Sequence, residues 1–125
     1  EYFEWQKNES IVIIQIEHKQ ALENLEPILK VHGVDGLIIG PYDLSCSMGI
    51  PGQFEHPDFK EAMDYILETG KKLSVPTGLH IIEPDEKSLE NCVNEGFRFI
   101  AYSVDIRILD VVARQGIIKF RELNQ

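Results

Sequence analysis

The chain repeats one pattern of apolar and polar positions four times from Ser10 onward. Each repeat has a short apolar run rich in Ile, Val, Leu or Phe, then a polar turn, then a segment with apolar residues three or four positions apart. Such runs predict β-strands, and such spacing predicts amphipathic helices. Because the runs are apolar almost throughout, they favour a parallel sheet covered on both faces. The predicted strands span residues 11–17, 36–40, 76–82 and 97–103.

Start and stop signals bound the helices that follow these strands. Pro57 lies in the first turn of one predicted helix, Gly96 follows the end of another, and Asp105 stands where an N-cap of the last is expected. The predicted helices span residues 20–30, 57–72 and 85–94, and the fourth starts after Asp105 and runs to about Arg114.

Four βα units make half of an eightfold (β/α)8, or TIM, barrel, a fold that typically needs about 250 residues. Half a barrel leaves its first and last strands unpaired and its inner face bare, so we expect either a fragment or two copies that complete each other. The alternative is a small open sheet of flavodoxin type, although Glu17-His18-Lys19 stands where a Gly-rich phosphate turn is expected. Residues 1–125 contain no linker or low-complexity stretch, which predicts one structural unit.

Composition narrows the class of protein. A formal charge of −9 argues against a nucleic-acid partner, and no apolar run is long enough to cross a bilayer, so we expect no membrane partner. Cys46 and Cys92 match no zinc spacing, which favours buried free thiols in a reducing, cytoplasmic compartment. The chain starts at Glu1 with neither Met nor a leader, as expected of an excised or processed piece.

The residues that end each apolar run carry the candidate chemistry, because active sites of parallel α/β folds lie at the carboxyl ends of the strands. Gln15 and Glu17 leave the same face of the first strand, and Asp43 follows the second. Neighbouring strands lie about 4.8 Å apart, which lets two such carboxylates reach one divalent cation. Two oxygen ligands with open positions suit Mg²⁺ or Mn²⁺. Spacing alone makes this a weak signal, because acidic residues often follow strands.

Four segments together resemble the signature of one family. They are Gln-Ile-Glu at 15–17, Gly-Val-Asp-Gly-Leu-Ile-Ile-Gly-Pro-Tyr-Asp-Leu-Ser at 33–45, Met-Gly-Ile-Pro-Gly at 48–52 and His-Pro at 56–57. In order and spacing they are similar to the class II pyruvate aldolases that act on hydroxy-oxo-dioic and 2-keto-3-deoxy sugar acids, relatives of the citrate lyase β subunit. The resemblance spans essentially the whole chain and implies strands five to eight, the C-terminal half of the barrel.

The resemblance implies a role for each matching residue. Glu17 and Asp43 are the implied ligands of a divalent metal ion, Mg²⁺, Mn²⁺ or Co²⁺. Gln15 and the backbone amides of Tyr42 and Asp43 are implied to hold the carboxylate of a pyruvate-like substrate. Tyr42 departs from the small residue often found there, which leaves the shape of the pocket open.

The activity implied is reversible aldol cleavage of a 2-keto-4-hydroxy acid to pyruvate and an aldehyde, through a metal-bound pyruvate enolate. In that mechanism the metal replaces a Schiff-base lysine, and no Lys falls within the four predicted strands. The family also uses an Arg that binds the enolate and a His that assists proton transfer, both from the first half of the barrel. We therefore expect this chain to have little or no activity alone, and we expect a homo-oligomer or pairing with the missing half.

The histidines favour structural roles. His18 has the opposite parity to Glu17, so a surface or helix-start position is expected. His56 precedes Pro57 and is expected to organise the helix start. His80 lies in the middle of a predicted strand, where a hydrogen-bonded interior histidine is more common than a catalytic one.

Structural roles are also favoured for three other side chains that could take part in chemistry. Ser45 has no neighbouring base to activate it, which favours a capping role. Cys46 lacks nearby basic residues and is expected to pack in the core. Asp105 ends the fourth strand, where N-capping is favoured over a substrate or ion contact.

Two other functions stay open from the sequence. One is a lyase of citrate lyase β type that keeps the metal and takes a CoA thioester. The other is a noncatalytic half-barrel assembly module, suggested by the four βα units and by the aromatic cluster of Tyr2, Phe3 and Trp5.

Overall fold

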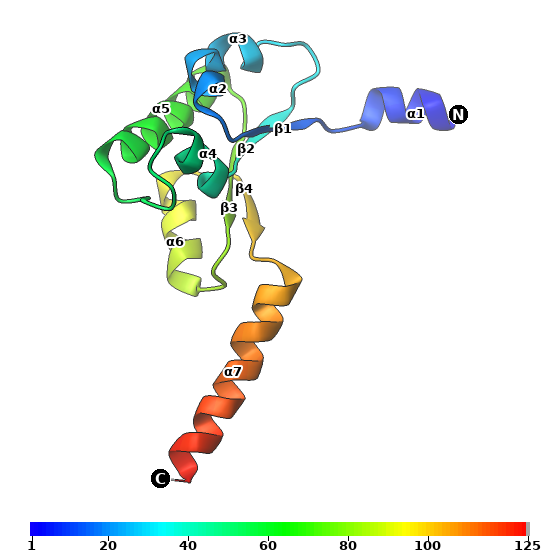
Figure 1. The fold of residues 1–125 in the computed structure, drawn as a ribbon. Helices are drawn as coiled ribbons and strands as arrows, with labels where there is room; N and C mark the ends of the chain where they lie inside the picture. Colours follow the sequence, from blue (N-terminus) through cyan, green and yellow to red (C-terminus); the bar gives the residue numbers. More distant parts are fainter. Residues whose placement is uncertain (125) are drawn as a thin grey trace.

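A computed structural model describes residues 1–124 and contains one four-stranded parallel sheet (Figure 1). The strands lie in the order of the sequence, β1 beside β2, β2 beside β3 and β3 beside β4. Their bounds are β1 Ile13–Ile16, β2 Gly36–Ile39, β3 Thr77–Ile81 and β4 Phe99–Tyr102. The helices are α1 Tyr2–Glu9, α2 Lys19–Glu23, α3 Leu25–Leu29, α4 Pro41–Ser47, α5 Pro57–Leu73, α6 Glu86–Glu95 and α7 Asp105–Leu123.

The strand order separates the two predicted architectures. A flavodoxin-type sheet reverses direction after its first crossover, so its first two strands are exchanged in space. Here each strand lies beside the next strand in the sequence, and each connection between two strands contains at least one helix. This is the winding of a (β/α)8 barrel, which confirms the predicted half-barrel fold.

Helices cover one face of the sheet only. Ile16, Leu37 and Ile39 point to that face and are buried among side chains of the covering helices such as Leu25 and Ile66. Figure 1 shows α2 to α6 gathered on this side of the strands. The hydrophobic core therefore lies between the sheet and the outer layer of helices.

The opposite face, which would line the inside of a closed barrel, is bare. Ile13 and Phe99 point to it and keep 39% and 42% of their surface exposed. Helices α1 and α7 extend away from the sheet, and neither contains a buried residue (Figure 1). The sequence predicted a sheet covered on both faces, and the described residues supply the cover for one.

The predicted helix at 20–30 is two short helices in the structure, and Pro27 explains the break. A proline lacks the backbone N–H that a continuous helix needs, and its ring clashes with the carbonyl four residues earlier, here Glu23. Helix α2 ends at that residue, Asn24 leaves helical geometry, and α3 starts at Leu25. The prediction of one continuous helix was wrong.

The remaining helix boundaries largely follow their signals. The His56 imidazole accepts a hydrogen bond from the Asp58 amide at the start of α5, which confirms its structural role. Gly96 ends α6 in the left-handed conformation that favours glycine. Asp105 is the first residue of α7 rather than its N-cap, which is Val104, and α7 extends beyond the predicted end to Leu123.

No helix within residues 1–124 is long and apolar enough to cross a membrane.

We expect Gly78→Ala to lower the free energy of unfolding by about 3 kcal/mol, because the new methyl would overpack against fixed backbone. A Cβ at Gly78 would lie 2.5 Å from the Phe99 carbonyl oxygen and 2.8 Å from its ring. Gly116→Ala is the matched control, since a Cβ there meets no atom within 4 Å and alanine favours the helix by up to about 1 kcal/mol. Chemical denaturation followed by circular dichroism compares the two, and equal stabilities would contradict the close β3–β4 contact.

Candidate active site at the carboxyl ends of β1 and β2

Gln15 and Glu17 lie against the backbone of Gly40, at the carboxyl ends of two adjacent strands. A Cβ built on Gly40 would lie 2.9 Å from the Gln15 Nε2, 3.4 Å from the Glu17 Cβ and 3.7 Å from the Glu17 Oε2. The Gly40 amide also donates to the Ile16 carbonyl at 3.1 Å, which continues the β1–β2 ladder by one residue. The prediction that Gln15 and Glu17 lie on one face of the strand is therefore confirmed, and both side chains lie against Gly40.

Helix α4 brings the other two predicted residues to the same end of the sheet. Gly40 is its N-cap and accepts the Leu44 amide at 2.9 Å, and Pro41 opens the helix. Tyr42 and Asp43 are therefore the second and third residues of the first turn, where amide groups lack helical acceptors. The helix was not predicted, although the Pro after a strand end signals a helix start.

The two predicted carboxylates are available to a ligand. The side chains of Glu17 and Asp43 are exposed and form no hydrogen bond or ion pair with residues 1–124. Oxygen donors on exposed carboxylates fit a hard divalent cation that keeps waters and accepts further oxygens. Among the described residues no three His, Cys, Asp or Glu side chains gather into a metal-binding group, so this half offers an open pair rather than a closed cage.

The ring of Tyr42 is held by a neighbouring loop. It packs edge-on against Phe54 with ring centroids 5.0 Å apart, and Phe54 packs against Phe59 of α5 at 5.3 Å. Tyr42 still keeps 48% of its surface exposed. The larger side chain thus occupies a packed position while its amide stays in the first turn of α4, as the predicted backbone contact requires.

Ser45 fixes the shape of the loop after α4. It is fully buried, its hydroxyl donates to the Tyr42 carbonyl at 2.8 Å, and its oxygen accepts the Gly52 amide at 3.0 Å. Ser45 lies inside α4, whose N-cap is Gly40 and whose C-cap is Met48, so the predicted capping position was wrong. The two hydrogen bonds agree with a structural hydroxyl.

The two cysteines differ in environment. Cys46 is exposed on α4, so its predicted core position was wrong, whereas Cys92 is buried and free as predicted. Burial raises the pKa of the Cys92 thiol, and the nearby carboxylates Glu95 and Asp85 act in the same direction.

His18 and His80 both form hydrogen bonds with the backbone. His18 is the N-cap of α2 and its Nδ1 accepts the Gln20 amide at 3.2 Å, which confirms a helix-start role. His80 is half-buried in β3, and its Nε2 lies 3.4 Å from the Ser103 carbonyl oxygen. Ser103 gave no signal in the sequence, because its importance comes from a backbone conformation.

An ion-pair network joins α7 to the loop after β3. The Arg107 guanidinium donates to both Glu83 oxygens, at 2.7 Å from its Nη2 and 3.0 Å from its Nε, and also to Asp110 at 2.6 Å. The hydrogen bonds to Glu83 raise the pKa of Arg107, with Asp110 adding to the effect. The network orients the first turns of α7 and leaves the predicted site untouched.

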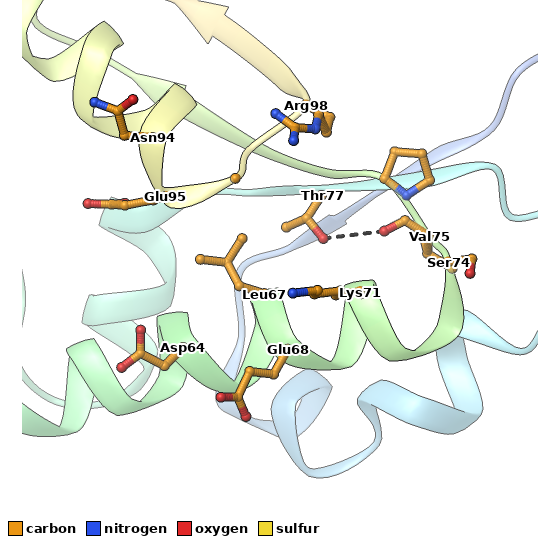
Figure 2. Close-up of a pocket in the computed structure, with 13 residues that line it drawn as sticks. Asp64, Leu67, Glu68, Lys71, Ser74, Val75, Thr77, Asn94, Glu95 and Arg98 are labelled. Atoms are coloured by element: carbon orange, nitrogen blue, oxygen red, sulfur yellow. Dashed lines mark hydrogen bonds between the residues drawn. The ribbon is translucent and has the colours of Figure 1, made fainter.

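A cleft of about 730 Å³ lies at the opposite end of the sheet, and Figure 2 shows it. Its walls come from α5 and from the end of α6, with Thr77 and Arg98 near the starts of β3 and β4. Inside it the Thr77 hydroxyl donates to the Val75 carbonyl at 3.4 Å. None of the predicted site residues lines this cleft, which separates it from the carboxyl ends of the strands.

The fold and the strand-end residues define a partial parallel α/β barrel with oxygen donors at the carboxyl ends of its strands. Residues 3–110 match the family model described as HpcH/HpaI aldolase/citrate lyase. The chain belongs to this family.

Individual relatives agree with this assignment. The chain is 42% identical to a pyruvate aldolase of Rhizobium etli over 82% of this chain and 40% of that protein. It is 37% identical to a 2-keto-3-deoxy-L-rhamnonate aldolase of Klebsiella pneumoniae over 78% of this chain and 36% of that one. A family structure from Burkholderia cenocepacia superposes with a TM-score of 0.89 at 32% identity, covering 96% of this chain and 46% of that chain. The chain thus spans less than half the length of these relatives.

We expect Ser45→Ala to lower the free energy of unfolding by about 1–2 kcal/mol, because two hydrogen bonds to the buried hydroxyl are lost. Ser10→Ala is the matched control, since Ser10 is exposed and its hydroxyl has no partner within residues 1–124. Thermal unfolding measures both variants. If the two variants unfold alike, Ser45 does not fix the loop.

Proposed function

We propose that this chain is the half of a divalent-metal-dependent pyruvate aldolase that carries the cation site. The observation that supports the proposal most directly is the placement of Gln15 and Glu17 against Gly40, with Asp43 in the first turn of the helix that starts there. In that arrangement, Glu17 and Asp43 are the residues that hold the cation.

The protein groups around the cation have complementary tasks in this proposal. Gln15 and the amides of Tyr42 and Asp43 bind the carboxylate end of a 2-keto acid and orient its keto group. When bound, the cation supplies positive charge next to the oxygen on which negative charge develops. Gly40 has no side chain, which lets the side chains of Gln15 and Glu17 lie together over the end of the strand.

The proposed reaction is reversible cleavage of a 2-keto-4-hydroxy acid. The C4 hydroxyl loses its proton and the bond between C3 and C4 breaks, so that C4 with its oxygen becomes the aldehyde and the electron pair of the broken bond forms the pyruvate enolate. A proton added at C3 then gives pyruvate. The names of the two relatives support this class of substrate, since one is a pyruvate aldolase and the other acts on a 2-keto-3-deoxy sugar acid.

We further propose that the bare inner face pairs with the missing half of the barrel. The free edges of β1 and β4 need parallel neighbours, and the exposed Ile13 and Phe99 need apolar cover. The groups that bind the enolate and move the proton belong to that half in the proposal.

The combined change Glu17→Gln and Asp43→Asn tests the cation site in the complete barrel. We expect at least about a 100-fold loss of aldol cleavage, because the cation is held by neutral groups only. Titration with Mn²⁺ followed by electron spin resonance should show weaker binding. The matched control combines Glu23→Gln and Asp64→Asn, two exposed acids outside the site. Full activity and Mn²⁺ affinity in the Glu17 and Asp43 variant would refute the proposal.

Light scattering on the chain alone tests the bare face. We expect self-association, because apolar side chains on the inner face and on α7 are unpartnered. Addition of the other barrel half should replace the self-associated form with a one-to-one complex and restore aldolase activity that the chain alone lacks. A clean monomer with cooperative melting, or robust aldol turnover by the chain alone, would contradict the pairing.

A further inference from the structure

His80 lies on the bare inner face, at the same end of the sheet as Glu17. Its neighbours along β3 point the other way, since Leu79 packs on the core and Ile81 is buried. The register pairs His80 with Ala101 of β4. The last β2–β3 pair is Ile39 with Leu79, and one residue further along both strands His80 lies beside Gly40. The position next to His80 on β4 thus carries only a methyl group, and the position next to it on β2 is a glycine over which Gln15 and Glu17 lie.

One ring nitrogen of His80 is engaged in a hydrogen bond with the protein backbone. Nε2 lies 3.4 Å from the Ser103 carbonyl oxygen, which can only accept a hydrogen bond, so Nε2 carries the hydrogen. With one proton on the ring, Nδ1 is then an acceptor. Nδ1 has no hydrogen-bond partner within residues 1–124.

Ser103 is itself fixed in a strained conformation. Its φ of 62° lies in the left-handed region, which non-glycine residues rarely adopt. The Ser103 amide donates to the Ile81 carbonyl at 2.6 Å, and its hydroxyl donates to the Ile82 carbonyl at 2.7 Å. Strained backbone that neighbouring bonds hold in place is common at functional sites. Here it presents the Ser103 carbonyl to the His80 ring.

Glu17, Gly40 and His80 lie at one level on three successive strands. The β1–β2 register places Glu17 beside Gly40, one step beyond the pair of Ile16 and Ile39. Two strand spacings separate Glu17 from His80, about 10 Å. That span fits a 2-keto-4-hydroxy acid whose keto-acid end lies at Glu17 and whose hydroxyl end lies towards β3.

We propose that His80 is a specificity-determining residue whose Nδ1 accepts a hydrogen bond from the C4 hydroxyl of the substrate. The inference rests on the proposed aldolase function and deepens it, because it assigns the recognition of the aldehyde-derived end to this half of the barrel. His80 holds the hydroxyl in place and is not assigned the removal of its proton.

Two reactions of the complete barrel separate this contact from the cation site. Cleavage of 4-hydroxy-2-oxopentanoate requires the C4 hydroxyl, whereas decarboxylation of oxaloacetate reaches the same pyruvate enolate by loss of CO₂ from C4 and has no such hydroxyl. We expect His80→Leu to lower kcat/KM for cleavage about 10- to 100-fold more than for decarboxylation. His32→Leu, the same change at an exposed loop histidine, should alter neither reaction.

The choice of amide substitution distinguishes substrate contact from support of the fold. In His80→Asn the amide stands near the position of Nδ1, and in His80→Gln it stands near Nε2. We expect Asn to recover cleavage relative to decarboxylation and Gln not to. Recovery by Gln alone, or equal losses in both reactions for His80→Leu, would overturn the proposal and make His80 a structural partner of Ser103.

Glu17→Gln shows which of the two proposals fails. It should lower both reactions, since both pass through the enolate. If both survive, the cation-site proposal falls and the His80 inference falls with it. If both are lost while His80→Leu leaves the ratio of the two reactions unchanged, only the His80 inference falls.

The tautomer of the His80 imidazole can be measured on this chain alone and does not depend on an activity assay. Long-range ¹H–¹⁵N spectra of the imidazole, assigned with His80→Gln, distinguish hydrogen on Nε2 from hydrogen on Nδ1. We expect the Nε2–H form. The Nδ1–H form would leave no acceptor at Nδ1 and would overturn the proposal.

Discussion

The close approach of β1 to the backbone of Gly40 is the constraint on which the site depends. Parallel pairing brings the carboxyl ends of β1 and β2 together, but a side chain at position 40 would displace the Gln15 amide, which lies 2.9 Å from where its Cβ would stand. Because glycine stands there, Gln15 and Glu17 can lie over the strand end while α4 starts directly behind them. Strand pairing, the start of the helix and the placement of the donors therefore share one small residue.

Much of this could be predicted from the sequence, because the responsible forces act over short distances. The apolar runs locate the strands, the alternation of side chains along a strand places Gln15 and Glu17 on one face, and local signals locate the start of α5 and the end of α6. The break between α2 and α3 was also readable, since Pro27 is incompatible with a continuous helix.

The remaining features depend on contacts between distant segments. Ser45 is a structural residue because the Gly52 amide lies against it, and the exposure of Cys46 depends on how α4 packs. The left-handed Ser103 is held by carbonyls of the β3 end, more than twenty positions away in sequence. No local pattern encodes these contacts, so the Ser103–His80 hydrogen bond could not be predicted from the sequence.

The two faces of the sheet separate stability from chemistry. On the helix-covered face, buried aliphatic side chains such as Leu37 and Ile39 hold the strands in register, and that register places every strand-end residue. The bare face carries Glu17 and His80 and also the exposed Ile13 and Phe99. A partner that covers this face therefore both buries the apolar surface and closes the site. In the proposed function, completion of the core and completion of the catalytic centre are therefore one structural event, since both use the same face of the same four strands.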